Sequence, residues 1–335
     1  MPHRRIIGRA VATTARLRRN LGGKVVEQGF LQLANLGRMH PRARPHRHNV
    51  EVRRDIPYLD TGLAEHRLDV YWPTHTPPPW PVVLYVHGGG FRILSKDTHW
   101  LMGLSFARRG YLVFNINYRL APRYPFPAAF DDCCDALQWV ADHAAAWGGD
   151  LERLFLAGES AGANLATSLA LAASYRRPHA GATAIFDRGI RARAVMAACG
   201  IYEVSNIGRF GDHPRIRKFV LDRLTEVHDG YLGHTDVKDP AVLDFADPLR
   251  VLERGEPPEA PLPAFFLPCG TSDPLVYDNK RMERAMAGMA LPHLARYYPG
   301  ELHAFHAFIW RTQARQCWAD WFEFAEPFRQ PAPAP

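Results

Sequence analysis

Short apolar runs alternate with longer segments of helical periodicity from about residue 66 to residue 326. Continuous apolar runs of this kind are typical of strands that are buried on both faces of a parallel sheet. The pattern predicts strands over 67–73, 81–86, 111–116, 154–157, 191–200, 263–270 and 294–300, and helices within 126–150, 163–173, 279–290 and 311–326. Because strands that alternate with helices need crossover connections, we expect a mostly parallel, twisted sheet covered by helices on both faces.

Residues 201–240 interrupt this alternation. Within them, the stretch RIRKFVLDRLTEVHDGYL has a helical pattern that does not continue the sheet. We therefore expect an insertion above the carboxyl ends of the strands, which would form a helical cap together with residues 1–45. The predicted organisation is an N-terminal cap segment over 1–45, a main α/β domain over 46–330 and a proline-rich tail over 331–335.

The composition is that of a soluble globular protein, since the 335 residues are 47% hydrophobic and 22% charged. The longest apolar stretches, such as 161–173, are too short and too rich in alanine to cross a bilayer, so no membrane-spanning helix is expected. The five cysteines are scattered and odd in number, and they lack the spacing of a zinc site. A reducing compartment suits them better than a disulfide framework, so a cytoplasmic location is expected.

The net charge of +7 is concentrated in the first 50 residues, where eleven Lys and Arg stand against one acidic residue, Glu27. In RRIIGRAVATTARLRRNL, apolar and arginine side chains fall on opposite faces of a helix. Residues 1–22 are therefore a cap helix, a helix that rests on an anionic membrane surface, or an organellar transit peptide, and all three interpretations remain open. Nucleic-acid binding is not expected, because the positive charge is confined to this arm and no binding motif accompanies it.

The stretch LFLAGESAGANLATSLALAA (154–173) joins a short apolar strand to a helix rich in Ala and Leu. Because five residues must turn one element into the other, Ser160 is expected in a strained backbone conformation with its hydroxyl ahead of the helix. Gly158 and Gly162 must be small, since strand and helix lie close together there. This G-x-S-x-G pattern is that of a nucleophile elbow. The alternative is a glycine turn whose serine caps the helix.

A glycine loop, HGGGF at 87–91, follows a predicted strand upstream of the elbow. The backbone N–H groups of glycines lie uncovered and can approach a ligand closely. We therefore expect Gly88 and Gly89, together with Ala161 after the serine, to donate hydrogen bonds to the oxyanion of a tetrahedral intermediate. His87 is expected to orient this loop.

Taken jointly, HGGGF, NYRLAPRYPFPAAFDD (117–132), GESAG, SDPL and HAF make the chain resemble the hormone-sensitive-lipase-like family of α/β-hydrolases over about residues 66–326. The resemblance implies a sheet of about eight strands, an N-terminal cap, no metal, no cofactor, and hydrolysis of carboxylic esters through an acyl-enzyme. Three positions depart from the family pattern. Glu159 stands where the family has Asp or Thr, Arg123 where it has Glu, and Ala304 where it has Gly.

The acid of a catalytic triad in this fold follows the serine along the chain. Two Asp-Pro-Leu tripeptides compete for this role. Asp247 lies ahead of the predicted strand 263–270, whereas Asp273 lies in a loop beyond it, at the carboxyl end where catalytic residues belong. We therefore expect Asp273 to orient the histidine, with Asp278 and Asp247 as alternatives.

Three histidines follow the acid and compete as the base. His293 precedes the strand that ends near residue 298, which is the wrong end. His303 and His306 both follow that strand, and both fit the family's His-x-Phe pattern. His303 is preferred because it stands nearer the end of the strand, in the loop.

The expected function is hydrolysis of short to medium acyl esters. Ser160 would attack the carbonyl, His303 would move the proton, and Asp273 would orient the imidazole of His303. A deacetylase or amidase with the same triad is one alternative, and a non-catalytic relative that binds a small molecule is another. The expected partner is a small-molecule ester. A homodimer and peripheral membrane contact through residues 1–22 remain open.

Overall fold

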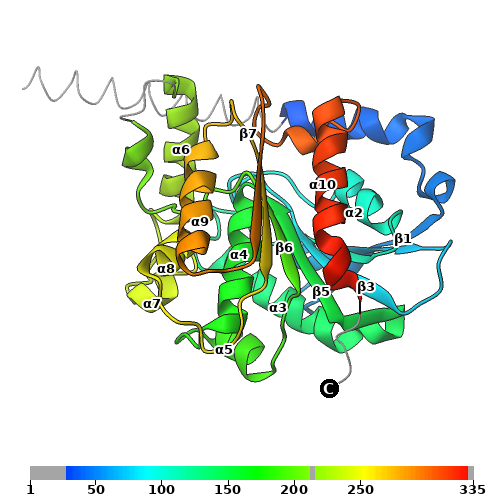
Figure 1. Ribbon diagram of the computed structural model, residues 1–335, viewed down its shortest axis with the longest axis horizontal. Helices are drawn as coiled ribbons and strands as arrows, with labels where there is room; N and C mark the ends of the chain where they lie inside the picture. The colour runs from blue at the N-terminus through cyan, green and yellow to red at the C-terminus, as the bar shows by residue number, and fades with distance from the viewer. Residues whose placement is uncertain (1–27, 212–215, 331–335) are drawn as a thin grey trace, which may run out of the picture.

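The computed structural model describes residues 28–211 and 216–330 (Figure 1). An eight-stranded sheet in the order β1-β2-β4-β3-β5-β6-β7-β8 forms its centre. β1 pairs antiparallel with β2, and β2 pairs antiparallel with β4, whereas the other neighbours are parallel. The predicted mostly parallel sheet of about eight strands is therefore confirmed. The strands are β1 (Val50–Pro57), β2 (Arg67–Pro73), β3 (Trp80–Val86), β4 (Leu112–Ile116), β5 (Gly149–Glu159), β6 (Ala194–Ala198), β7 (Ala264–Gly270) and β8 (His293–Tyr298).

Helices cover both faces of the sheet (Figure 1), as the alternation predicts. α2 and α10 lie on one face, and α3, α4 and α9 lie on the other. The helices are α2 (Trp100–Ala107), α3 (Ala128–His143), α4 (Ala161–Ser174), α5 (Ala180–Asp187), α6 (Lys218–Tyr231), α7 (Pro240–Leu243), α8 (Pro248–Arg254), α9 (Val276–Gly288) and α10 (Thr312–Arg329), with a further helix over 28–39.

The side chains of the central strand β3 alternate between two hydrophobic clusters. Val82 and Leu84 belong to the cluster that contains α3 and α4. Val83 and Tyr85 belong to the cluster that contains α2 and α10. Because both faces are buried, a central strand needs apolar residues at every position, which explains the continuous apolar runs in the sequence.

The sequence analysis missed several elements, among them the strand β1 and the helices α5, α7 and α8. β1 reads VEVRRDIP, and most of its residues are exposed or half-buried because it lies at the edge of the sheet. Charged side chains on an edge strand hide the apolar alternation that would reveal it. The predicted strand over 191–200 is shorter in the structure, where β6 spans Ala194–Ala198.

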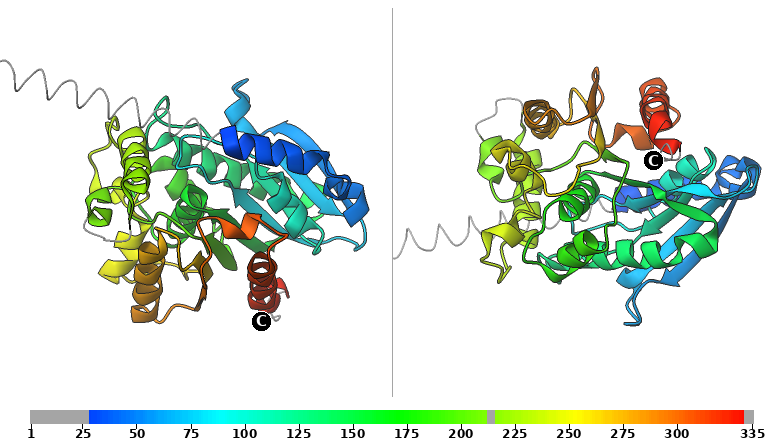
Figure 2. Two further views of the ribbon diagram at one scale, coloured as in Figure 1. Left: turned by 90° about the horizontal axis from the view of Figure 1, so that it is seen from above. Right: turned by 60° about the horizontal axis from the view of Figure 1, so that its bottom comes forward.

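The helix over 28–39 and α6 lie at the end of the molecule where the parallel strands have their carboxyl ends (Figures 1 and 2). The first belongs to the predicted cap segment 1–45, and α6 belongs to the predicted insertion 201–240. Residues 1–27 and 331–335, on which the predictions of an amphipathic arm and a flexible tail fall, lie outside the described residues. Among the residues that the structure describes, no helix is long and apolar enough to cross a membrane.

Candidate active site

Ser160 stands at the turn between β5 and α4. Its backbone has φ 56° and ψ −116°, a conformation that non-glycine residues rarely adopt, so the predicted strained turn is confirmed. A Cβ placed on Gly162 would lie 2.1 Å from the carbonyl oxygen of Val86, and one on Gly158 would lie 2.5 Å from the backbone of Gly162. Strand and helix thus leave no room for a side chain at either glycine. The side chain of Ser160 makes no capping hydrogen bond to α4, so the capping alternative is wrong.

A cavity of about 330 Å³ opens beside Ser160. Parallel strands bring their carboxyl ends to one edge of the sheet, and the loops there commonly form ligand sites. Here four such ends contribute walls besides the elbow, through Gly89 after β3, Ile201 after β6, Leu275 after β7 and His303 after β8. The remaining walls come from the helix over 28–39 and from α6.

Asp273 and His303 are in contact, as a catalytic acid and base require. Nδ1 of His303 lies 2.8 Å from Oδ2 of Asp273. The Asp273 side chain is buried, and its Oδ1 accepts the N–H of Leu275 at 2.8 Å, which fixes the carboxylate. The His303 side chain is 36% exposed and lines the cavity. Burial disfavours the imidazolium, but Asp273 and the Cys199 thiol outweigh it and raise the pKa of His303 well above the usual value.

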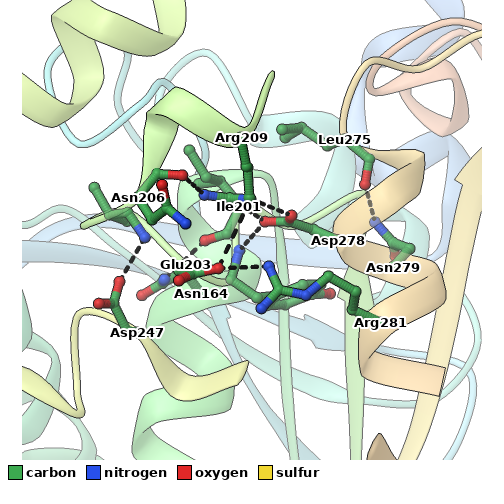
Figure 3. A network of polar contacts seen from close by, with 12 residues as sticks. Asn164, Ile201, Glu203, Asn206, Arg209, Asp247, Leu275, Asp278, Asn279 and Arg281 are labelled. Atoms are coloured by element: carbon green, nitrogen blue, oxygen red, sulfur yellow. Dashed lines mark hydrogen bonds and ion pairs between the residues drawn. The ribbon is translucent and has the colours of Figure 1, made fainter. Parts of the chain in front are cut away.

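The alternative acids are engaged elsewhere, and neither lines the cavity. Asp247 accepts the N–H groups of Val204 and Ser205 at 2.5 and 3.0 Å. Asp278, in α9, is buried and lies 2.6 Å from the guanidinium of Arg209. Both carboxylates therefore hold the chain that follows β6 (Figure 3).

The alternative bases are also placed away from the cavity. His293 begins β8, at the amino end of that strand. His306 is buried, and its carbonyl oxygen accepts the indole N–H of Trp318 at 3.0 Å. Burial lowers the pKa of His306 to about 4, so this imidazole stays neutral at ordinary pH.

Two cavity walls are fixed from behind by amide side chains (Figure 3). Asn164 of α4 donates a hydrogen bond of 2.8 Å to the carbonyl oxygen of Ile201. Asn279 of α9 donates one of 3.1 Å to the carbonyl oxygen of Leu275. Buried polar groups that find such partners hold a loop in one arrangement.

Glu159 ties the glycine loop to the elbow. The N–H of Gly88, predicted as an oxyanion donor, donates instead to Oε1 of Glu159 at 2.5 Å. Gly89 has φ 115°, and its N–H finds no acceptor in residues 28–211 and 216–330. Ala161 is the first residue of α4, and N–H groups of a first helical turn lack an intrahelical acceptor. Gly89 and Ala161 are therefore the predicted donors that remain available to an oxyanion.

The sequence analysis did not identify two partners of Glu159, His99 and Tyr85. Nε2 of His99 lies 2.7 Å from Oε1, and the Tyr85 hydroxyl donates to Oε2. Burial opposes the ionisation of Glu159, but His99 outweighs it, and the pKa of Glu159 falls to about 2. A buried acid beside the serine is itself a signal that a cation lies nearby, because an unpaired buried charge is costly.

Within the described part of the chain, one group of three side chains has the spacing of a metal site. The ligand atoms of Cys199, Asp273 and His303 lie within 4.8 Å of one another. Two of the three already form the acid and base contact described above. Asp273 and His303 are therefore already engaged with each other within this group.

The chain is similar to known proteins in sequence and in fold. A sequence model of a family described as alpha/beta hydrolase fold matches residues 83–307. Carboxylesterase NlhH of Mycobacterium tuberculosis is 42% identical over 110 residues, which cover 32% of this chain and 34% of the relative. Tuliposide A-converting enzyme 2 of Tulipa gesneriana is 42% identical over 104 residues, which cover 28% of this chain and 27% of the relative. The chain thus matches about a third of the length of these curated relatives.

Solved structures extend the likeness to most of the chain. The esterase LipW from Mycobacterium marinum has a TM-score of 0.71 and 24% identity, and the match covers 92% of this chain and 90% of that one. A structure titled Bacterial Heroin Esterase has a TM-score of 0.68 and 24% identity, with 84% of this chain and 85% of that one covered. At this identity the likeness establishes the fold.

Proposed function

Because the chain belongs to the alpha/beta hydrolase fold family, we propose that it is a carboxylesterase in which Ser160 forms an acyl-enzyme. One observation carries the proposal: His303 contacts the fixed carboxylate of Asp273 at the wall of the cavity that Ser160 also lines. The similarity to a protein named a carboxylesterase supports it.

The proposed reaction begins when Oγ of Ser160 attacks the ester carbonyl carbon and Nε2 of His303 accepts the serine proton. Asp273 keeps its hydrogen bond to Nδ1 and stabilises the imidazolium. The N–H groups of Gly89 and Ala161 bind the negative charge that develops on the carbonyl oxygen. When the tetrahedral intermediate collapses, the bond to the alcohol oxygen breaks and His303 returns the proton to that oxygen.

Water completes the cycle. His303 accepts a proton from the water as it attacks the acyl carbon, and the second tetrahedral intermediate collapses to a carboxylic acid and free Ser160. The same oxyanion donors serve both steps.

We propose that the helix over 28–39 and α6 cap this site, and that the substrates carry short to medium acyl chains. Phe30 and Phe219 line the cavity from these two helices. A volume of about 330 Å³ is at the small end of ligand pockets, which disfavours long-chain triglycerides.

The proposal is tested by initial rates on 4-nitrophenyl esters from acetate to decanoate near pH 8. Ser160→Ala should lower kcat/KM by at least about a thousandfold, since removal of the nucleophile alone collapses such a triad. Ser205→Ala is a matched control, because Ser205 is exposed and does not line the cavity. Turnover that survives Ser160→Ala would refute the serine mechanism. Absence of turnover in the intact protein would favour the non-catalytic binding alternative.

A further inference from the structure

A charged group stands in the cap-side wall of a cavity that is otherwise mainly apolar. Arg92, just after the glycine loop, and Arg223 and Glu226, on α6, all line the cavity. Nη1 of Arg92 lies 3.0 Å from Oε2 of Glu226, and Nη1 of Arg223 lies 3.0 Å from the same oxygen. Two guanidinium groups therefore share one carboxylate oxygen, and the group carries one net positive charge.

This arrangement leaves hydrogen-bonding capacity unused. Among the described residues, Nε of Arg92, Nε of Arg223 and Oε1 of Glu226 are buried without a hydrogen-bond partner. Nη1 of Arg223 is ion-paired with Glu226 at 3.0 Å but lacks the geometry of a hydrogen bond. Buried polar groups in folded proteins almost always have partners, so unsatisfied ones call for a ligand, an ion or water. A guanidinium presents several N–H groups in a planar fork, and its preferred partners are carboxylates and phosphates.

The sequence of α6 places this group in the wall by helical spacing. Phe219, Arg223 and Glu226 follow one another at intervals of four and three residues, so they share one face of the helix. The guanidinium carbon of Arg223 lies 5.3 Å from the centre of the Phe219 ring, which is a cation–π contact. Phe219 and Arg223 thus form one continuous surface on the cap.

α6 also packs directly against the glycine loop. A Cβ placed on Gly90 would lie 2.7 Å from a methyl group of Val227, one residue beyond Glu226. The shared carboxylate therefore links α6 to the chain that follows the proposed oxyanion donor Gly89. The cavity beside Ser160 thus extends between the glycine loop and α6.

We infer that Arg92 and Arg223 form an anion-binding site in this cavity. The preferred substrates are then esters that carry a carboxylate or a similar anionic group on the acyl or the alcohol part. The inference rests on the proposed esterase function and names its substrate class. A neutral apolar group at this place would leave the guanidinium donors unsatisfied, whereas a carboxylate would accept their hydrogen bonds in a site of low dielectric.

Two pairs of esters test the inference. In the first pair, 4-butyryloxybenzoate carries a carboxylate on the alcohol side, where its methyl ester carries a neutral ester group that is larger by one methyl. In the second pair, monoethyl adipate and ethyl hexanoate differ by a negative charge on the acyl side. We expect at least one anionic ester to exceed its neutral partner by about tenfold in kcat/KM, the worth of one hydrogen bond between charged groups.

Arg223→Gln should abolish that preference, because it removes the charge and keeps part of the side chain. Lys218→Gln is the matched control. Lys218 is exposed on the same helix and does not line the cavity, so its loss removes the same charge from the cap. A wild-type preference for neither anionic ester would overturn the inference. So would a preference that survives Arg223→Gln or that falls equally in Lys218→Gln.

Failure of the esterase proposal is distinguishable from failure of this inference. If neutral esters are hydrolysed without any anionic preference, the inference alone is wrong. If no ester is hydrolysed, the inference is tested by the binding of the first ester pair to the Ser160→Ala protein. Calorimetry should then give a Kd for 4-butyryloxybenzoate about tenfold below that of its methyl ester, with the difference lost when Arg223→Gln is added. Equal Kd values would overturn the inference.

Discussion

The backbone N–H of Gly88 donates a hydrogen bond of 2.5 Å to the side chain of Glu159, the residue before Ser160, so one buried carboxylate joins the glycine loop to the elbow. The same carboxylate receives His99 and Tyr85 on its two oxygens. The proposed oxyanion donors are close by in the sequence, since Gly89 follows Gly88 directly and Ala161 is two residues after Glu159. The separation of the loop from the elbow therefore depends on Glu159.

Replacement of this carboxylate should destabilise the protein. Glu159→Gln leaves His99 buried without its counter-ion, which costs about 3 kcal/mol of unfolding free energy near pH 7. The pKa of Glu159 falls from 4.5 to about 2 in the folded protein. A depressed pKa stabilises the folded state above about pH 4.5, and this contribution is lost as the pH falls toward 2. The difference between wild type and Glu159→Gln should thus shrink below pH 4.5.

Urea denaturation at pH 7, 5 and 4 measures this difference. Glu152→Gln is the control, because Glu152 is an exposed acid on the same strand, and its replacement should change the stability by less than about 0.5 kcal/mol. A Glu159→Gln protein as stable as wild type at pH 7 would show that the Glu159–His99 pair does not hold the loop.

The pH dependence of kcat/KM should report the Asp273–His303 contact. His303 acts as a base only when neutral, and Asp273 raises the pKa of His303 above the usual value near 6.5, against the effect of burial. Activity should therefore fall on the acid side with a midpoint above 6.5. Asp273→Asn should lower the rate by about a thousandfold or more, because the imidazolium loses its stabilising partner. A midpoint at or below pH 6, or a mild effect of Asp273→Asn, would contradict the assignment.

The elbow should not tolerate a methyl group at Gly162. A Cβ there would lie 2.1 and 2.8 Å from the carbonyl oxygens of Val86 and His87, so strand and helix would have to separate. Gly162→Ala should cost about 3 kcal/mol or more of unfolding free energy. Gly288→Ala is the control, since nothing lies within 4 Å of a Cβ at the end of α9, and it should be neutral within about 0.5 kcal/mol. Equal unfolding midpoints for the two variants would refute the close approach at the elbow.

The parts of the site that the sequence predicted lie within local patterns. The turn at Ser160 is dictated by the strand before it, the helix after it and the glycines on either side, all within a few residues. The parts that the sequence did not predict depend on contacts between distant segments. His99 meets Glu159, and Arg92 meets Glu226, only because the sheet and α6 bring their elements together.

The Gly88 prediction failed for a related reason. A glycine loop indicates that N–H groups are accessible, but the sequence does not say which group within reach accepts each hydrogen bond. The longer side chain of Glu159, where the family that the sequence resembles has Asp or Thr, reaches Gly88 and takes its N–H.

The central claim is that Ser160 is the nucleophile, and covalent labelling tests it most directly. Diethyl 4-nitrophenyl phosphate transfers its diethylphosphoryl group to an activated serine and releases nitrophenolate. Intact-mass and peptide analysis should find one such group per chain, attached to Ser160, with esterase activity lost in proportion to labelling. Ser160→Ala should remain unlabelled. A group found on another residue, or activity that persists after Ser160 is fully labelled, would contradict the account.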